Sequence, residues 1–262
     1  MIAKTTIISQ VADEPCTLTN PGGGSSIVLV CEHASNRIPT EYNNLGLDDA
    51  TRTSHIAWDP GASAVARALS TLLDAKLVQS TISRLVYDCN RPPEAADCIP
   101  AKSEIYEVPG NQGLEDDDRA HRVDMAYRPF QRLLARTLES ISEPALVTIH
   151  SFTPIYFGAR RATEIGILHD ADSRLADEML RISADTLPGL VERNRPYGPA
   201  DGVTHTLKEH AIEKGRLNVM IEIRNDLIAT SAQQEEMAKA VGKALAMALT
   251  NLGRPVSLKV AV

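Results

Sequence analysis

Residues 27–36 read IVLVCEHASN, in which five apolar residues, IVLVC at 27–31, are followed at once by polar ones. A continuous apolar run of this length is typical of a β-strand covered on both faces. Helical periodicity follows: Asp59 and Pro60 predict an N-cap and a first-turn proline, and apolar residues then recur at helical spacing as far as Leu73. A buried strand followed by an amphipathic helix predicts an α/β protein.

The rest of the chain repeats this alternation. Further strands are predicted at 76–79, 85–89, 145–149, 164–168 and 219–223. Further helices are predicted at 117–141, bent or broken by Pro129, and at 173–186 and 231–252. The first 25 residues read as an irregular lead-in and residues 90–116 as a long loop. No repeat or linker divides the chain, so we expect a single α/β domain spanning residues 1–262.

Composition excludes several classes of protein. The net charge is −7 and there is no basic tract, so the chain is a poor candidate for binding nucleic acid. Its apolar runs are too short to cross a bilayer, and the N-terminus lacks a secretory signal. The four cysteines form no CxxC pair, which is typical of reduced thiols. We therefore expect a cytoplasmic protein, whose oligomeric state the sequence leaves open.

Polar side chains accompany four of the predicted strands. They are EHASN at 32–36, SR at 83–84 with DCNR at 88–91, HSFT at 150–153, and EIRND at 222–226. Ligands of open α/β sheets bind beyond the carboxyl ends of the strands. The sequence therefore predicts that these residues converge on one cleft.

Two histidines at strand ends, with a carboxylate nearby, are what a catalytic zinc site requires. Zinc lowers the pKa of a bound water, and a second carboxylate can then act as general base. Each residue also has a simpler interpretation. A histidine at a strand end is often structural, Asp59 could only cap its helix, and Arg91 could be a solvated loop residue. Glu222 could pair with Arg224 or Arg84.

Six motifs give the chain a resemblance to the N-formylglutamate amidohydrolase family. They are CEHASNRIP at 31–39, HIAWDPGA at 55–62, SRLVYDCNRP at 83–92, PGN at 109–111, IHSFTP at 149–154 and IEIRND at 221–226. The chain is more distantly similar to zinc carboxypeptidases and aspartoacylase. The resemblance implies a phosphorylase/hydrolase-like fold, a three-layer α/β/α sandwich with a mixed, mostly parallel central sheet.

The resemblance also implies one Zn²⁺ per chain. His33 and His150 match its histidine ligands. The distant pattern has Glu three residues after the first histidine, but this chain has Asn36 there, so the third ligand must come from elsewhere. We expect Asp59 to supply it. Glu32 is the alternative, although as the neighbour of His33 on an extended backbone it should point the other way.

The remaining matches concern the reaction. Glu222 matches the general base, and Arg84 matches the arginine that stabilises the oxyanion. Asn90 and Arg91 match the pair that grips a substrate α-carboxylate. Arg160 or Arg161 could meet a second carboxylate.

The expected function is therefore hydrolysis of a small anionic N-acyl amino acid, N-formyl-L-glutamate above all, to formate and glutamate. Two alternatives stay open. One is a deacylase for another N-acyl amino acid or a peptide-like substrate, and the other is a non-catalytic binding protein on the same fold. Serine-hydrolase chemistry is disfavoured because the chain has no GxSxG motif.

Overall fold

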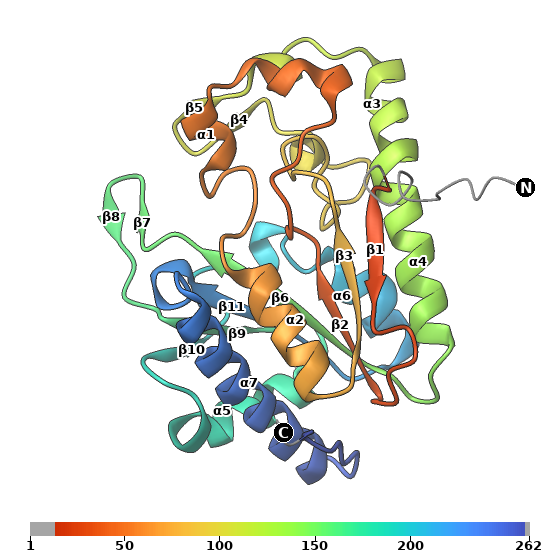
Figure 1. The fold of residues 1–262 in the computed structure, drawn as a ribbon, viewed down its shortest axis with the longest axis vertical. Helices are drawn as coiled ribbons and strands as arrows, with labels where there is room; N and C mark the ends of the chain where they lie inside the picture. The colour runs from red at the N-terminus through yellow and green to blue at the C-terminus, as the bar shows by residue number, and fades with distance from the viewer. Residues whose placement is uncertain (1–13, 260–262) are drawn as a thin grey trace, which may run out of the picture.

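The computed structural model describes residues 14–259, and its centre is a seven-stranded sheet (Figure 1). The strand order is β1-β3-β2-β6-β11-β9-β10. Four neighbouring pairs are parallel, and the two antiparallel pairs are β1 with β3 and β11 with β9. The sheet is thus mixed and mostly parallel, as predicted.

The strands are short, and five of the eleven that the structure describes, β2, β3, β6, β9 and β11, occupy predicted stretches. They are β1 Cys16–Thr19, β2 Ile27–Cys31, β3 Lys76–Ser80, β4 Lys102–Ser103, β5 Tyr106–Glu107, β6 Ala145–Phe152, β7 Ile155–Tyr156, β8 Ala159–Arg160, β9 Ile165–Leu168, β10 Val191–Arg193 and β11 Asn218–Arg224. Two pairs, β4 with β5 and β7 with β8, form separate antiparallel hairpins.

The helices cover both faces of the sheet. They are α1 Asp49–Thr53, α2 Ala62–Leu72, α3 Asp116–Arg122, α4 Arg128–Glu139, α5 Arg174–Thr186, α6 His205–His210 and α7 Ser231–Asn251, with a π-helical turn at Val123–Tyr127. Within residues 14–259, no helix combines the length and the hydropathy that a membrane span requires.

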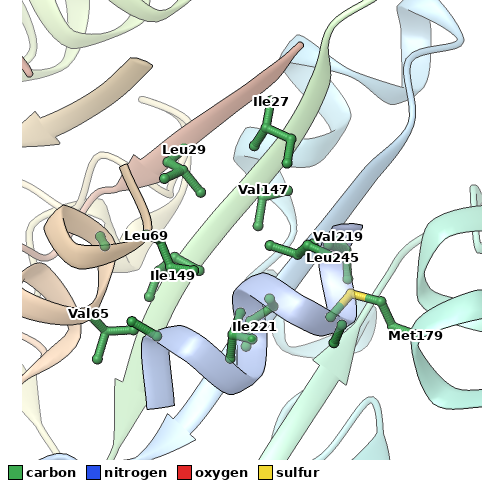
Figure 2. Packing of buried hydrophobic residues seen from close by; sticks show 14 of the residues in the cluster. Ile27, Leu29, Val65, Leu69, Val147, Ile149, Met179, Val219, Ile221 and Leu245 are labelled. Carbon is green, nitrogen blue, oxygen red and sulfur yellow. The ribbon is translucent and has the colours of Figure 1, made fainter. Parts of the chain in front are cut away.

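Strand pleating divides the core into two layers. Alternate residues such as Ile27, Val147 and Ile221 pack against α2, α5 and α7, as Figure 2 shows. The intervening residues, among them Leu146 and Met220, pack against α4 and α6 on the opposite face. The predicted α/β fold with helices on both faces of a central sheet is confirmed.

The strand predicted at 85–89 is wrong, because this segment is a tight turn with buried apolar side chains. The hydroxyl of Ser83 accepts a hydrogen bond from the N–H of Leu85 (3.2 Å) and donates one to the carbonyl of Ala57 (2.8 Å). Such local bonds compete with an extended backbone. The apolar run therefore indicated a buried segment and not a strand. The turn nevertheless brings Arg84 and Asp88 to the edge of the sheet.

Other parts of the fold also differ from the predictions. Residues 16–19 of the expected irregular lead-in form β1, whereas residues 1–13 lie outside the described range. The predicted helix at 117–141 is divided by the π-helical turn, after which Pro129, which lacks an N–H, sits in the first turn of α4. β10 and the two small hairpins were not predicted from the sequence.

Candidate metal and catalytic site

The carboxyl edge of the sheet carries the candidate site. His150 on β6 and Glu222 on β11 are register partners, so strand pleating directs both side chains to the same face. β6 continues to Phe152, and His150 therefore lies within the strand rather than just beyond it. His33 follows the end of β2, the neighbour of β6 on its other side.

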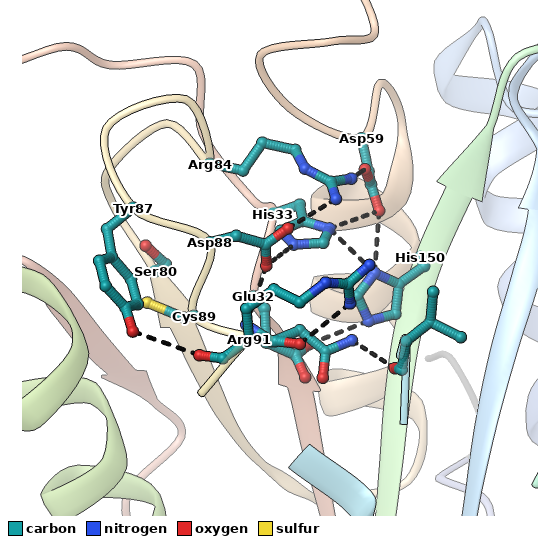
Figure 3. A network of polar contacts seen from close by, with 12 residues as sticks. Glu32, His33, Asp59, Ser80, Arg84, Tyr87, Asp88, Cys89, Arg91 and His150 are labelled. Carbon is teal, nitrogen blue, oxygen red and sulfur yellow. Dashed lines mark hydrogen bonds and ion pairs between the residues drawn. The ribbon is translucent and has the colours of Figure 1, made fainter. Parts of the chain in front are cut away.

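Three buried side chains converge there, as Figure 3 shows. His33 Nδ1 and His150 Nδ1 lie 3.2 Å apart, and Asp59 Oδ2 lies 3.3 Å from the first and 3.0 Å from the second. None of the three residues is more than 3% exposed. Ligand atoms about 2 Å from a tetrahedral zinc lie about 3.3 Å from one another, so this spacing fits a small divalent ion.

Each histidine has a carboxylate against its other ring nitrogen. His33 Nε2 hydrogen bonds Asp88 Oδ1 at 2.7 Å. His150 Nε2 lies 3.1 Å from Glu32 Oε2, close enough for an ion pair although not aligned as a hydrogen bond. Carboxylates in these positions favour a proton on Nε2 and a lone pair on Nδ1, the arrangement of metal-ligating histidines. Three acceptor atoms would then face one another, which a cation between them stabilises.

The charges around the histidines also favour a cation at this position. Burial opposes a positive charge on His150, but Glu32 and Asp59 outweigh it and raise the pKa of His150 well above its usual value. Burial and Arg84 likewise oppose a charge on His33, yet Asp88 and Asp59 raise its pKa. The surrounding carboxylates therefore favour positive charge at this point, which either protons or a metal ion can supply.

Asp59 does not cap helix α2, contrary to the sequence-based prediction. Gly61 is the N-cap, with a left-handed φ of 83°. A Cβ at this position would meet the carbonyl oxygen of Ile228 at 2.6 Å, so glycine is required. The Asp59 side chain is thereby directed into the site, where its Oδ2 also accepts the N–H of Ser151 (3.1 Å).

Glu32, the alternative carboxylate ligand, lies outside the group of three converging atoms. It is fully buried behind His150, and the His150 charge lowers the pKa of its carboxyl against the opposing effect of burial. Its position is that of an orienting partner.

Arg84 lies beside the histidines and bridges two of the carboxylates. Its Nη2 donates to Asp88 Oδ2 (2.6 Å), and its Nη1 is 3.6 Å from Asp59 Oδ1. Its side chain keeps 29% exposure, so the guanidinium reaches the open space in front of the site. Although burial opposes ionisation of Asp88, Arg84 and His33 hold its pKa well below the usual range. Asp88 thus fixes a histidine and an arginine together.

Glu222 is a buried carboxylate that faces the cavity. Among the described residues, its Oε2 has no hydrogen-bond partner. Burial, reinforced by Asp59, raises the pKa of Glu222 to about 7, although the histidines and Arg84 act against this. Arg224, which sequence analysis offered as its partner, instead pairs with Asp226 and Glu164. Glu222 is therefore free to take up a proton near neutral pH.

These side chains border a cavity of about 280 Å³, which Asn90 and Arg91 also line. Both are held by the backbone at 201–206. The Asn90 amide donates to the carbonyl of Val203 and accepts the N–H of Thr206. Arg91 donates to Asp97, to the carbonyls of Gly202 and Asp201, and to that of Asn90. By donor count, each side chain retains one N–H beyond these contacts.

The two remaining predicted arginines differ in position. Arg160 is exposed on β8 and does not line the cavity. The Arg161 guanidinium lies over the rings of Phe152, Tyr156 and Tyr197, at 4.3–5.5 Å from their centroids. These three aromatic residues line the cavity, so Arg161 stands directly behind its wall.

Asp88 was expected in the cleft as part of DCNR at 88–91 but without a specific role, and no role was predicted for Tyr197, His55 or Glu104. Asp88 carried a signal, because it lies within the SRLVYDCNRP motif four residues after Arg84. Tyr197 carried none. It lines the cavity two residues after Arg195, whose carbonyl oxygen packs so closely on Gly166 that a Cβ there would lie 1.9 Å from it.

Fold and site together define the class, an α/β protein with three buried side chains that could hold a metal ion at the carboxyl edge of its sheet. The sequence profile of the N-formylglutamate amidohydrolase family matches residues 25–229. The chain belongs to this family, which supports an amidohydrolase role.

Two solved structures are similar to this chain. A gene product of Agrobacterium tumefaciens is 48% identical, with a TM-score of 0.90, over 92% of this chain and 97% of the other. N-formylglutamate amidohydrolase from Ralstonia eutropha JMP134 is 19% identical, with a TM-score of 0.56, over 91% of this chain and 99% of the other; this second likeness concerns the fold alone. No match was found among curated proteins.

Proposed function

We propose that this protein is a metal-dependent amidohydrolase that cleaves N-formyl-L-glutamate to formate and glutamate. The observation that carries the proposal is the convergence of three buried acceptor atoms, from His33, Asp59 and His150, within 3.0–3.3 Å of one another. Family membership, and the name of the Ralstonia relative, support the amide bond and the formyl group as the target.

The proposed ion is one Zn²⁺ per chain, held by His33 Nδ1, His150 Nδ1 and Asp59 Oδ2. Two histidines and one carboxylate are a set that catalytic zinc sites use. When bound, the ion would supply Lewis-acid chemistry, polarising the amide carbonyl and making water easier to deprotonate. Asp88 and Glu32 would hold the two imidazoles in the required tautomer.

Glu222 is the proposed general base. Its Oε2, which has no hydrogen-bond partner in the part of the chain that the structure describes, takes a proton from the attacking water and passes it to the departing amine nitrogen. A carboxyl with a pKa of about 7 is suited to both transfers at neutral pH. A protein that only bound ligand would have no use for this carboxylate, which argues against a non-catalytic binding protein.

Arg84 is the proposed oxyanion partner. Asp88 fixes one of its nitrogens, and the partly exposed guanidinium retains further N–H donors at the cavity. A donor fixed before the reaction stabilises developing negative charge at little reorganisation cost.

The substrate carboxylates require cations in a cavity that has several acidic residues. We propose that the spare N–H groups of Asn90 and Arg91 bind the α-carboxylate, because their other contacts hold both side chains in place. Arg161, whose guanidinium lies behind the aromatic wall of the cavity, is the proposed source of positive charge for the second carboxylate. Arg160 could meet that carboxylate only from outside the cavity, because it is exposed and does not line the cavity.

We further propose that the protein acts in the cytoplasm. Its four cysteines are all free, and three of them are buried, as in chains that remain reduced.

A substrate screen tests the proposed function. N-formyl, N-acetyl and N-succinyl derivatives of glutamate, aspartate and histidine should be assayed for amine release, with and without added zinc. Zinc-dependent release from N-formylglutamate is the expected result. Faster release from another acyl group would indicate a different deacylase, and no release from any compound would contradict amidohydrolase activity.

A further inference from the structure

The outer wall of the cavity is assembled from three segments that are distant in the sequence. They are the loop carrying His55, the tip of the β4–β5 hairpin at Glu104, and the β7–β8 hairpin, whose Tyr156 lines the cavity. Figure 1 shows the β7–β8 hairpin projecting from the sheet, so its position depends on contacts made near its tip.

The Glu104 carboxylate joins these three segments. Its Oε2 lies 2.8 Å from His55 Nε2, and its Oε1 accepts the N–H of Phe157 at 2.9 Å. The Glu104 side chain is only 9% exposed, although neighbouring Ile105 is 64% exposed. Charge-assisted hydrogen bonds of this kind are about twice as strong as neutral ones.

The backbone gives a second, independent indication. Glu104 has a φ of 53° and Phe157 a φ of 46°, so both hairpin tips place a side chain in the left-handed region. Glycine and asparagine adopt this region more readily than glutamate or phenylalanine. A glutamate kept in an unfavourable backbone conformation is explained if its side chain is needed.

The link has a direct consequence for the cavity. Phe157, whose N–H is bound, follows Tyr156, which lines the cavity and lies under the Arg161 guanidinium at 4.3 Å from its ring centroid. Fixing Phe157 therefore fixes the wall against which substrate would rest.

We propose that Glu104 is a positioning residue that holds the β7–β8 hairpin in place as the outer wall of the substrate cavity. It acts on substrate binding through Tyr156 and Arg161, and it is separate from the proposed metal ligands. The proposal rests on the proposed function only for its kinetic readout.

The test compares Glu104→Ala and Glu104→Gln with Glu107→Ala in the full-length, zinc-supplemented protein. Glu107 is a matched control, because it lies on the same hairpin and, within the described residues, the polar contacts of its side chain are those with Lys102 and Gln112. Glu104→Ala should raise KM for N-formylglutamate about tenfold with kcat within about twofold, since charged hydrogen bonds are lost outside the reacting centre. Glu104→Gln keeps a hydrogen-bond acceptor, so its KM should lie between those of the native protein and Glu104→Ala. The KM of Glu107→Ala should match that of the native protein.

Hydrogen exchange provides a readout that does not depend on activity. The amides of residues 155–160 should exchange about tenfold faster in Glu104→Ala, with unchanged exchange in β6 and unchanged zinc affinity. Native-like exchange at 155–160 would overturn the proposal, as would a Glu107→Ala effect equal to that of Glu104→Ala. If the native protein does not cleave N-formylglutamate, the proposed function fails, but the exchange result still decides the role of Glu104.

Discussion

Asp88 contacts His33 through one carboxylate oxygen and Arg84 through the other. Such pairing is the rule among the charged side chains of the site. Among the described residues, however, the oxygens of Glu32, behind His150, lack a hydrogen-bond partner. Two departures face the cavity, the three acceptor atoms that face one another and the Oε2 of Glu222, which likewise has no partner there. Buried polar atoms are rarely left without partners, so these are the positions where a metal ion and a reacting water are expected.

Asp88→Asn should weaken zinc binding about 10- to 100-fold, the usual effect of losing an outer partner of a ligand histidine. The amide keeps the shape of the side chain but removes the charge that favours a metal-ready His33. Competition with a chromogenic chelator measures the affinity. Asp97→Asn, which removes the exposed partner of Arg91, is the control and should bind zinc normally. Equal affinities in the two variants would show that Asp88 does not orient the ligand.

Glu222→Gln should reduce turnover roughly a hundredfold or more while zinc stays bound, because glutamine cannot accept the proton of the attacking water. Formate release and metal content should be measured on the same samples. Turnover near the native value would leave Glu222 a structural role only.

At the scale of elements, the turn at 82–91 is the least predictable part of the site. Its apolar residues read as a strand, and no local pattern distinguishes a buried strand from a buried turn. The start of helix α2 was also predicted incorrectly from a local pattern. Asp59 and Pro60 resemble a helix start, but Gly61 is the N-cap. By contrast β2 was predicted to the residue, because its five apolar positions are flanked by polar or small ones.

The contact between residues 90–91 and the backbone at 201–206 leads to a prediction on specificity. Arg91→Lys removes the planar guanidinium that bonds Asp97 and the Gly202 carbonyl. It should raise KM for N-formylglutamate about tenfold or more. The same compound with its α-carboxylate blocked as an amide should already be a poor substrate for the native protein. Its KM should differ little between the native protein and Arg91→Lys. Equal turnover of free and blocked compounds by the native protein would contradict the carboxylate clamp.

Helix α6 carries a histidine whose burial makes stability depend on pH. His210 hydrogen bonds Gln131 on α4 through Nε2, and within the described residues its Nδ1 has no partner. Burial, reinforced by Lys214, lowers the pKa of His210 from 6.5 to about 4. The unfolded chain therefore binds the proton first as the pH falls. Stability present above pH 6.5 is lost between about 6.5 and about 4.

At pH 5 this loss should be about 2 kcal/mol. Urea unfolding of metal-free protein at pH 7.5 and pH 5 measures this loss of unfolding free energy. His210→Gln should lose correspondingly less unfolding free energy between the two pH values. His121→Gln, at an exposed position, should follow the native protein. An unchanged pH dependence in His210→Gln would refute the assignment.

At the scale of the whole molecule, the parallel strands gather residues from across the chain. From their apolar runs, sequence alone identified the strands that carry His150 and Glu222 and the strand that His33 follows. It predicted that the three residues meet because polar residues at the carboxyl ends of parallel strands share one edge. It could not supply the contacts that depend on how loops close, such as Glu104 with Phe157 or Arg161 with Tyr197. Those contacts join segments about 36 to 53 residues apart and leave no periodic signal.

The central claim is that His33, Asp59 and His150 hold a divalent ion on which hydrolysis depends. The most direct measurement is zinc titration of chelator-treated native protein and of Asp59→Asn, following zinc content and formate release from N-formylglutamate together. The native protein should bind about one zinc per chain and regain activity in proportion. Asp59→Asn should bind far more weakly, because a neutral amide is a poor zinc ligand. Full activity in metal-free native protein would contradict the claim.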